Sequence, residues 1–259
     1  MLLAIDAGNT ETKVGLFDGP QLIGVARLPT ARTPEPVCRT VAALLAGAGA
    51  GPRELDGVAI ATVVPSATGP LAEAARLVAG AAPLFLGADL DLRMPVRYEP
   101  PASLGADRLA NAVAARALHG APVIVVDCGT ATKIEAVDAR GVYLGGAIAP
   151  GIRSAADALF RRAALLDEVP LEAPARAIGG STREALQSGI VLGAAASIEG
   201  LVARFRDELG VQAPVVGTGG LLEIVAPACP VISEREPALT LHGIRLAWEW
   251  NRGEAGCQG

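Results

Sequence analysis

One short segment of this chain occurs twice, first near the N-terminus and again near the middle. Leu3–Val14 reads LAIDAGNTETKV and Ile124–Ile134 reads IVVDCGTATKI, and a single gap at Asn9 aligns the two copies. In each copy an apolar run ends in Asp, passes through Gly and Thr, and resumes after Lys, which is the pattern of a strand, a tight turn and a second strand. The repeat predicts two related halves, each built around such a hairpin.

The residues of the two turns suggest what the hairpins bind. Glycine lets the backbone turn sharply and approach a ligand closely, and the amides and hydroxyls of the turn can donate to phosphate oxygens. The Asp before each turn can hold a cation that is itself bound to phosphate. Two such hairpins facing each other would clamp the phosphates of a nucleotide, which makes phosphoryl transfer the first hypothesis. The alternative is a pair of ordinary hairpins that are similar by chance.

Length and composition limit the other possibilities. The 259 residues can form two modest domains, and the spacing of the repeat predicts them at 1–118 and 119–259. Aromatic residues make up only 3% of the chain, so stacking on nucleic-acid bases is not expected. The formal net charge of −5 gives no attraction to polyanions or anionic lipid, so we expect neither a nucleic-acid nor a membrane partner.

Cysteine usage and the N-terminus predict a cytoplasmic setting. The four cysteines show no paired spacing of the kind that indicates zinc or a disulfide framework. The chain reaches Asp6 after a few apolar residues without a basic leader. No later segment reads as an uncharged apolar run long enough to span a bilayer, so export and membrane insertion are not expected.

Hydrophobic periodicity and turn residues predict an α/β chain with mixed sheets. In the first half, beyond the hairpin, we expect strands at 21–28, 58–63 and 84–86, helices at 34–45, 69–78 and 104–118, and a proline-rich loop at 94–101. In the second half we expect strands at 122–127, 132–138, 142–148 and 214–216, and helices after 151 and at 181–209, 221–225 and 240–250.

Asp107 and Arg108 are candidates for the transfer of a phosphoryl group to an alcohol. Asp107 lies where a glycine-containing loop enters a predicted helix, so its carboxylate could orient and deprotonate a hydroxyl; alternatively it is a first-turn charge of the helix. Arg108 offers a planar fork that matches a carboxylate. Its alternatives are a solvated helix residue or an ion pair with Asp107.

Five motifs, in their order and spacing, resemble the ATPase superfamily of actin, Hsp70-type chaperones and sugar kinases, and within it the type III pantothenate kinases. They are Asp6-x-Gly8-Asn9-Thr10, Gly105-Ala106-Asp107-Arg108, Asp127-x-Gly129-Thr130-Ala131-Thr132, Gly145-Gly146-Ala147-Ile148-Ala149-Pro150-Gly151 and Thr218-Gly219-Gly220. The resemblance covers nearly the whole chain. It implies two duplicated ribonuclease-H-like (actin-like ATPase) domains with mixed central sheets and a cleft between them. It also implies a homodimer that phosphorylates pantothenate with ATP, the first step of coenzyme A synthesis.

The same resemblance implies roles for individual residues. Asp107 would be the catalytic base, and pantothenate would be bound by Tyr98, Gly105, Ala106, Asp107, Arg108 and Thr182. Tyr98 could equally be a packing aromatic, and Thr182 could be a helix cap. ATP would be bound by Asp6, Gly8, Asn9, Thr10, Lys13, Thr130, Gly219 and Gly220. Lys13 could instead be a surface residue of its strand, and Gly219-Gly220 could be a plain strand-to-helix turn.

The resemblance further implies two cations, Mg²⁺ at Asp6 and a monovalent ion, K⁺ or NH₄⁺, at Asp127. Three residues depart from the family pattern: Pro100 and Ser181 stand where Asn is usual, and Lys133 stands where Thr is usual. Lys133 could contact phosphate, partly replace the monovalent ion, or point out of its strand. Two rival functions stay open, a kinase for another small hydroxy acid and a regulatory protein that binds nucleotide without catalysis.

Overall fold

The structure, a computed structural model, describes residues 1–163 and 166–252, which divide into two compact units. Unit 1 comprises Met1–Ala114 and helix α8 (Leu239–Asn251), and unit 2 comprises Ala115–Ala238. The boundary falls within α3 (Ala106–His119), close to the expected one after residue 118. The larger difference is α8, which the sequence assigns to the second half and which belongs to unit 1.

Unit 1 is built on a five-stranded sheet in the order β3-β2-β1-β4-β5. Strands β1, β4 and β5 are parallel to one another, and β2 and β3 are antiparallel to their neighbours. The strands are β1 (Leu2–Ala7), β2 (Glu11–Asp18), β3 (Gln21–Pro29), β4 (Gly57–Thr62) and β5 (Leu84–Phe85).

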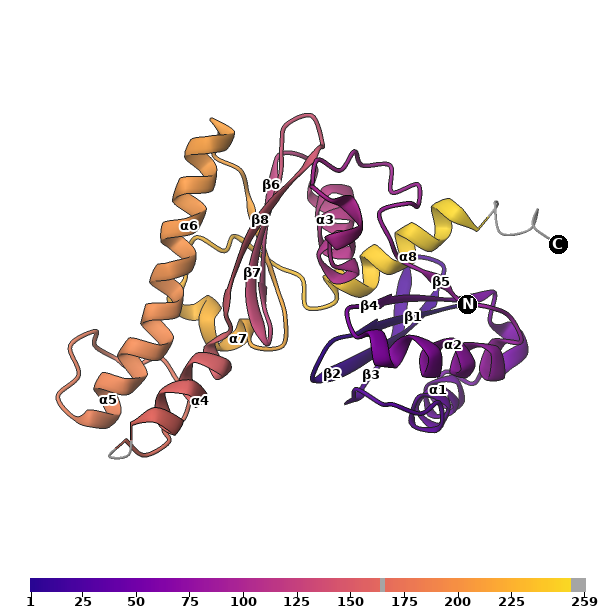
Figure 1. The fold of residues 1–259 in the computed structure, drawn as a ribbon, viewed down its shortest axis with the longest axis horizontal. Helices are drawn as coiled ribbons and strands as arrows, with labels where there is room; N and C mark the ends of the chain where they lie inside the picture. The colour runs from indigo at the N-terminus through magenta and orange to yellow at the C-terminus, as the bar shows by residue number, and fades with distance from the viewer. Residues whose placement is uncertain (164–165, 253–259) are drawn as a thin grey trace. The chain divides into compact units, whose positions relative to one another are not determined.

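Unit 2 repeats this topology, with its sheet in the order β10-β9-β6-β7-β8. Strands β6, β9 and β10 are parallel, and β7 and β8 are antiparallel to their neighbours. The strands are β6 (Val123–Cys128), β7 (Ala131–Val137), β8 (Tyr143–Pro150), β9 (Val215–Thr218) and β10 (Glu234–Arg235). The match of β1–β5 to β6–β10 confirms the predicted fold class, two duplicated α/β domains with mixed sheets (Figure 1).

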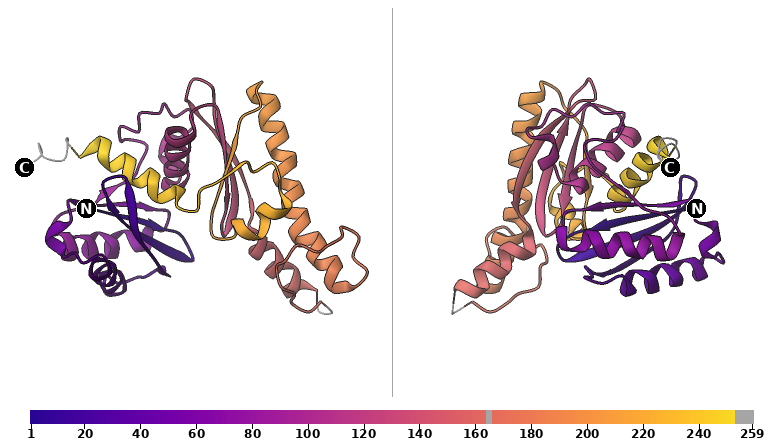
Figure 2. Two further views of the ribbon diagram at one scale, coloured as in Figure 1. Left: turned by 180° about the vertical axis from the view of Figure 1, so that it is seen from behind. Right: turned by 45° about the vertical axis from the view of Figure 1, so that its right-hand side comes forward.

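Helices cover both faces of the sheet in unit 1 (Figures 1 and 2). Helices α1 (Glu35–Gly47) and α2 (Pro65–Ala79) pack together on one face, and α8 packs on β1, β4 and β2 from the other. Because β1 is covered from both sides, its residues Leu3, Ala4 and Ile5 are all fully buried, as is typical of a central strand. Two single-turn helices, η1 (Pro52–Glu54) and η2 (Pro101–Ser103), complete the unit.

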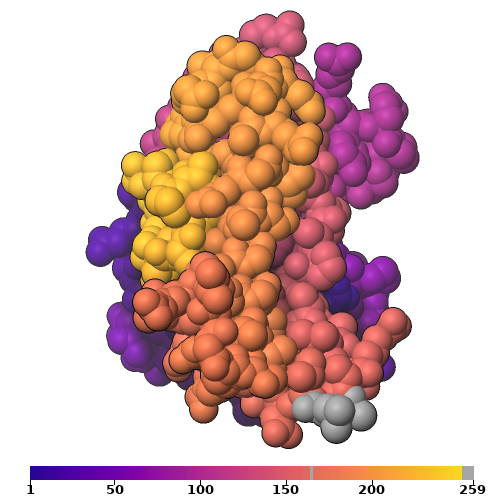
Figure 3. All heavy atoms as spheres, turned by 90° about the vertical axis from the view of Figure 1, so that its left-hand side faces the viewer, coloured from indigo at the N-terminus to yellow at the C-terminus, as the bar shows by residue number. Residues whose placement is uncertain are grey.

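In unit 2 the core lies between the sheet and a group of helices that follow β8. These are α4 (Ile152–Arg162), α5 (Thr182–Gln187), the π-helical turn η3 (Ser188–Leu192), α6 (Gly193–Leu209), α7 (Leu222–Val225) and the short η4 (Ala226–Ala228). Ile198 and Val202 of α6 join Ile124 and Val126 of β6 in one apolar cluster. Figure 3 shows the α5–α6 stretch running along the outer surface of this unit.

The stretch Thr182–Leu209 is the one helical segment, within the described residues, that is long and apolar enough to cross a membrane. On length and composition the expectation that no such segment exists is therefore not met. One third of its most apolar window is buried inside unit 2, where Val191, Ile198 and Val202 pack into the core. The segment thus has the contacts of a core helix in a globular domain.

Most predicted elements are present, with shifts at their ends. Helix α2 begins at Pro65, four residues before the predicted range, at a Pro65-Ser66 pair that itself suits a helix start because proline at the first helical position needs no amide partner. The predicted helix 181–209 is one continuous helical stretch, and it contains a π-helical turn at Ser188–Leu192. Strand β10 has no counterpart among the predictions, since its two residues are charged and exposed and only the pairing with β9 defines it.

Candidate active site

The two predicted hairpins have the same register. In the first, Asp6 of β1 lies opposite Lys13 of β2, and the Gly8 amide donates to the Glu11 carbonyl at 3.0 Å across the turn. In the second, Asp127 of β6 lies opposite Lys133 of β7. Residues opposite each other in an antiparallel pair point to the same face of the sheet. Each turn is therefore flanked by one acid and one lysine on a common face.

The second turn closes like the first, with one residue fewer. The Gly129 amide donates to the Ala131 carbonyl at 3.1 Å, which is the counterpart of the bond from Gly8 to Glu11. The gap at Asn9 in the alignment is thus an extra residue in the first turn. Asn9 and Thr10 are exposed there, and Thr130 is exposed in the second turn, so all three can reach a ligand in solution.

In unit 1, Val63 links the first hairpin to the loop that precedes α3. Its amide donates to the Ala7 carbonyl at 3.3 Å, next to Asp6, and its side chain lies against Gly105. A Cβ atom at Gly105 would lie 3.3 Å from Cγ1 of Val63 and 2.8 Å from Oδ1 of Asp107. A side chain at residue 105 would therefore displace the Asp107 carboxylate, which explains why the loop has glycine there.

Asp107 lies in the first turn of α3, as predicted, and is partly exposed. Its Oδ1 accepts a hydrogen bond from the backbone amide of Arg108 at 2.8 Å. This bond satisfies one of the amides that a helix start leaves unpaired, so the carboxylate is both fixed in position and close to the positive end of the helix. This position of Asp107 is compatible with both the helix-start alternative and the catalytic alternative.

Arg108 is buried, with 5% of its surface exposed, and it contacts Tyr98 in two ways. Its Nη1 donates to the tyrosine hydroxyl at 3.2 Å, and its guanidinium carbon lies 5.2 Å from the centre of the ring. The aromatic ring therefore supports the planar fork from one side. The structure thus brings together Tyr98, Gly105, Asp107 and Arg108, which the sequence places ten residues apart at most.

In unit 2 the glycine motifs gather around the second turn. Gly219 has a φ of +100°, and a Cβ atom there would lie 2.5 Å from both Oδ1 of Asp127 and the Cys128 carbonyl. A Cβ atom at Gly151 would lie 2.3 Å from the Gly129 carbonyl. Both positions accept only glycine, because the backbone approaches the turn too closely for a side chain. Gly220, the next residue, is exposed.

Thr182 has a different setting from the other predicted pantothenate ligands. It is the first residue of α5 and is exposed, and the preceding residue, Ser181, is the N-cap. The Ser181 hydroxyl accepts from the Glu184 amide at 3.3 Å, while Glu184 accepts from the Gly180 amide at 2.7 Å. Ser181, one of the three residues at which we expect a departure from the family pattern, therefore serves as the N-cap of α5 in this chain.

Asp6 fits a magnesium ion. It is partly exposed at the end of β1, beside a turn whose exposed Asn9 and Thr10 can hold phosphates. Mg²⁺ is usually held by one or two carboxylates together with phosphate oxygens and water, so a dense cluster of protein ligands is not required. No such cluster of three or more His, Cys, Asp or Glu side chains occurs in the described residues.

Asp127 does not fit a second cation. Nζ of Lys133 lies 2.8 Å from its Oδ2, and the two side chains are only 16% and 11% exposed. The single charge of the carboxylate is thus already balanced by an ammonium group at contact distance. Of the three alternatives for Lys133, the structure rules out a side chain that points away from the turn.

Cys128, between Asp127 and Gly129, is buried at the end of β6. Burial raises the pKa of its thiol to about 12, and the negative charge of Asp127 adds to the shift. Because only the thiolate is a strong nucleophile, this cysteine stays protonated and unreactive near neutral pH.

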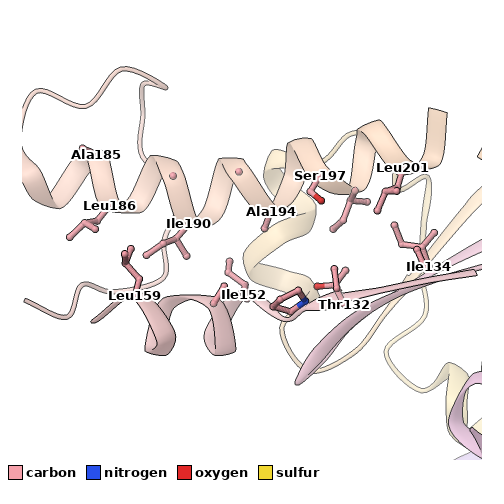
Figure 4. Close-up of a pocket in the computed structure, with 17 residues that line it drawn as sticks. Thr132, Ile134, Ile152, Leu159, Ala185, Leu186, Ile190, Ala194, Ser197 and Leu201 are labelled. Carbon is pink, nitrogen blue, oxygen red and sulfur yellow. The ribbon is translucent and has the colours of Figure 1, made fainter. Parts of the chain in front are cut away.

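A cavity of about 490 Å³ lies elsewhere in unit 2, between the α5–α6 stretch on one side and β7, β8 and α4 on the other. Figure 4 shows Leu186, Ile190 and Ala194 facing Leu159 and Ile152 across it. Among the described residues that line it, only Thr132 and Ser197 have polar side chains. An apolar cavity without charge does not suit phosphates, although Thr132, close to the second turn, is one of the residues that line it.

Sequence reasoning missed three supporting residues. Val63 joins Ala7 to Gly105, Gly151 packs on the second turn, and the Thr30 hydroxyl donates to the Gly8 carbonyl at 2.5 Å. Gly151 belongs to a recognised motif, but its contact with the turn is not visible from its spacing. Thr30 and Val63 each follow a strand end, which is the signal that could have identified them.

Comparisons with known proteins identify the family. A family model described as type III pantothenate kinase matches residues 2–204. The chain is 49% identical to the type III pantothenate kinase of Thermomicrobium roseum over 251 residues, which cover 96% of this chain and 97% of the relative. It is 44% identical to that of Roseiflexus castenholzii over 254 residues, 97% and 100% of the two chains.

Solved structures agree on the fold. The component A of (R)-2-hydroxyglutaryl-CoA dehydratase from Acidaminococcus fermentans matches with a TM-score of 0.58 and 14% identity, covering 98% of both chains. The activator of 2-hydroxyisocaproyl-CoA dehydratase from Clostridium difficile, solved with ADPNP, matches with a TM-score of 0.55 and 13% identity, covering 100% of this chain and 98% of the other. The family model and the sequence relatives show that the chain belongs to the type III pantothenate kinase family.

Proposed function

We propose that this protein transfers the γ-phosphoryl group of ATP to the primary hydroxyl of pantothenate, giving 4′-phosphopantothenate at the entry to coenzyme A synthesis. Membership of the type III pantothenate kinase family supports the activity. The observation that carries the proposal is the arrangement of Asp107 beside the buried, tyrosine-supported guanidinium of Arg108. An acid and a carboxylate-binding fork on consecutive residues match a substrate with one hydroxyl and one carboxylate.

Asp107 is the base in this proposal. Its carboxylate takes the proton from the hydroxyl of pantothenate while the hydroxyl oxygen forms a bond to the γ-phosphorus, and the bond to the ADP oxygen breaks. The hydrogen bond from the Arg108 amide to Oδ1 holds the carboxylate in position at the start of α3. Arg108 holds the pantothenate carboxylate, and Tyr98 orients the guanidinium. Gly105 and Ala106 form the rest of this loop, and Thr182 completes the substrate contacts.

ATP and Mg²⁺ are the co-substrate and its metal ion. Asp6 organises Mg²⁺, which neutralises phosphate charge when it is bound, and Gly8, Asn9, Thr10 and Lys13 contact the phosphates. Thr130 contributes from the second turn. The Gly219-Gly220 element lets the adenosine part of ATP lie against backbone, which the absence of side chains there supports.

The family resemblance also predicts K⁺ or NH₄⁺ at Asp127, and no step of the proposed reaction depends on that ion. The ion pair between Asp127 and Lys133 bears directly on this prediction.

We infer that the protein works as a homodimer in the cytoplasm, without a nucleic-acid or membrane partner. The apolar cavity of unit 2, with Ile148 of the adjoining β8 62% exposed, supports pairing with a second copy. Analytical ultracentrifugation at micromolar concentration tests this: a mass of two chains is expected, and a monomer at all concentrations would overturn the inference.

An assay of ADP release with and without pantothenate tests the proposed activity. Release that depends on pantothenate, with 4′-phosphopantothenate identified by mass spectrometry, is the expected result. A panel of other small hydroxy acids separates this function from the nearest rival kinase. Tight ATP binding without turnover on any alcohol would favour the regulatory alternative instead.

A further inference from the structure

We propose that the ammonium group of Lys133 takes the place of a monovalent cation at Asp127, so that this protein needs neither K⁺ nor NH₄⁺ for nucleotide binding or turnover. The inference rests on the proposed kinase function for its activity readout, while its binding and stability readouts are independent of that function. The inference follows from the contacts of the buried Asp127 carboxylate.

The position of Lys133 is fixed by the strand pairing. Lys133 of β7 lies directly opposite Asp127 of β6, and its Nζ is 2.8 Å from Oδ2. This distance is typical of a charge-assisted hydrogen bond between an ammonium and a carboxylate. Since both side chains are largely buried, solvent screens the pair little. The ion pair between Lys133 and Asp127 is therefore a fixed structural feature of the second turn, whereas an ion pair on the surface would be exposed to solvent.

The other side of the Asp127 carboxylate is closed by backbone. Oδ1 lies so near Gly219 that a Cβ atom there would be 2.5 Å away, and one at Gly129 would be 3.5 Å away. Thr218 of β9 lies opposite Asp127 in the parallel pairing of β9 with β6. Its hydroxyl is buried and makes no hydrogen bond to any of the described residues. A hydroxyl carries no charge, so the balance of charge at Asp127 comes from Lys133.

A second cation at this carboxylate would face like-charge repulsion. A K⁺ or NH₄⁺ ion bound to Oδ2 would compete with Nζ for the same oxygen, and one bound to Oδ1 would lie within a few ångströms of the ammonium. A lysine ammonium has the chemistry of NH₄⁺ but is attached to the chain, so it needs no binding from solution. A neutral residue at 133 would leave Asp127 as a buried, uncompensated charge unless an ion occupied the position.

The substitution Lys133→Thr is the matching experiment, because it removes the ammonium and restores the residue that the family pattern predicts. Wild-type protein and the variant are dialysed into tetramethylammonium chloride, and KCl then replaces this salt at constant ionic strength. ATP affinity is measured by calorimetry, the melting temperature by differential scanning fluorimetry, and ADP release with pantothenate by a coupled assay. Arg140→Thr serves as the control, since it removes an exposed cation from the same β-meander, in the turn between β7 and β8.

For the wild type and Arg140→Thr we expect KCl to change ATP affinity and ADP release by less than about twofold and to leave the melting temperature unchanged. For Lys133→Thr we expect weak ATP binding and a lowered melting temperature in tetramethylammonium chloride, and recovery of both in KCl. A purely structural role of Lys133 predicts no such recovery by K⁺.

The wild type alone keeps the inference falsifiable if Lys133→Thr does not fold. A rise of tenfold or more in its ATP affinity on exchange into KCl, or a KCl-dependent rise in its melting temperature that Arg140→Thr shares, overturns the inference. A protein without pantothenate-dependent ADP release in either salt refutes the proposed function, whereas the affinity and melting measurements still decide the role of Lys133.

Discussion

The hydroxyl of Tyr98 accepts a hydrogen bond from Nη1 of Arg108 at 3.2 Å, and the same guanidinium lies over the tyrosine ring. Tyr98 comes from the proline-rich segment before η2, and Arg108 comes from the first turns of α3. The contact therefore holds an irregular segment against a helix and orients a buried cation. Its value for the proposed function is that it fixes the orientation of the planar guanidinium.

Arg108→Lys should weaken pantothenate binding more than it slows catalysis. Lysine keeps the positive charge but loses the planar fork, so we expect the KM for pantothenate to rise roughly tenfold or more, with a smaller change in kcat. Tyr98→Phe removes only the acceptor and should raise KM by a few-fold. Steady-state kinetics with varied pantothenate measure both effects.

Arg93→Lys is the matched control, because Arg93 also lies over an aromatic ring in unit 1, 5.0 Å from the centre of Trp250. It should leave the KM for pantothenate unchanged. An equal rise in KM in the control and in Arg108→Lys would show that the effect is a general one of arginine loss, and an unchanged KM in Arg108→Lys would remove Arg108 from the substrate site.

Gly219→Ala should damage both stability and nucleotide binding. The added Cβ would lie 2.5 Å from Asp127 Oδ1 and from the Cys128 carbonyl, at a φ of +100° that alanine rarely adopts. Such a substitution costs about 1–3 kcal/mol in strain and displaced contacts, so the melting temperature should fall by several degrees. Calorimetry should show weaker ATP binding.

Gly200→Ala is the control for this substitution. Gly200 is exposed in α6 with no atom within 4 Å of an added Cβ, so alanine there should be neutral or stabilising by about 0.5–1 kcal/mol. If Gly219→Ala and Gly200→Ala behave alike, the close approach of Gly219 to the second turn is not a constraint in solution.

Cys128 should resist alkylation in the native protein. Burial and the charge of Asp127 raise the pKa of its thiol to about 12, so the thiolate is a negligible fraction at pH 8 and grows only as the pH approaches that value. Iodoacetamide labelling followed by peptide mapping checks this, with urea-unfolded protein as the fully reactive reference. Rapid native labelling of Cys128 at pH 8 would contradict the buried position of its side chain at the end of β6.

The hairpins could be predicted from sequence because their signals are local. Gly8 and Gly129 mark the turns, and apolar runs on either side mark buried strands, so the duplicated registers at Asp6 and Asp127 follow from short-range chemistry. The contact between Lys133 and Asp127 also has a local signal. Counting residues back from the turn pairs the two positions, which argues against a lysine that points away from the turn but does not choose between the other two alternatives.

Other features depend on contacts between distant parts of the chain. Helix α8 joins unit 1 because Thr240 donates to buried Asn111 at 2.8 Å and because Gly243 lets α8 approach the Ala110 carbonyl closely. Neither contact produces a periodic pattern in the sequence. The sequence therefore groups α8 with the second half of the chain, which it follows. Similarly, the approach of Gly151 and Gly219 to the second turn joins three separate motifs, whose spacing does not determine their contacts.

Asp107→Asn provides the most direct test of the central claim, that Asp107 activates the hydroxyl of pantothenate. Asparagine keeps an oxygen that can accept from the Arg108 amide, so the start of α3 and the ATP affinity should be preserved. Loss of the base should lower pantothenate-dependent ADP release by about 10²- to 10⁴-fold. The measurement is ADP release by the wild type and by Asp107→Asn, with ATP affinity by calorimetry. We predict unchanged ATP binding and a large loss of turnover, and a variant that turns over at the wild-type rate would contradict the account.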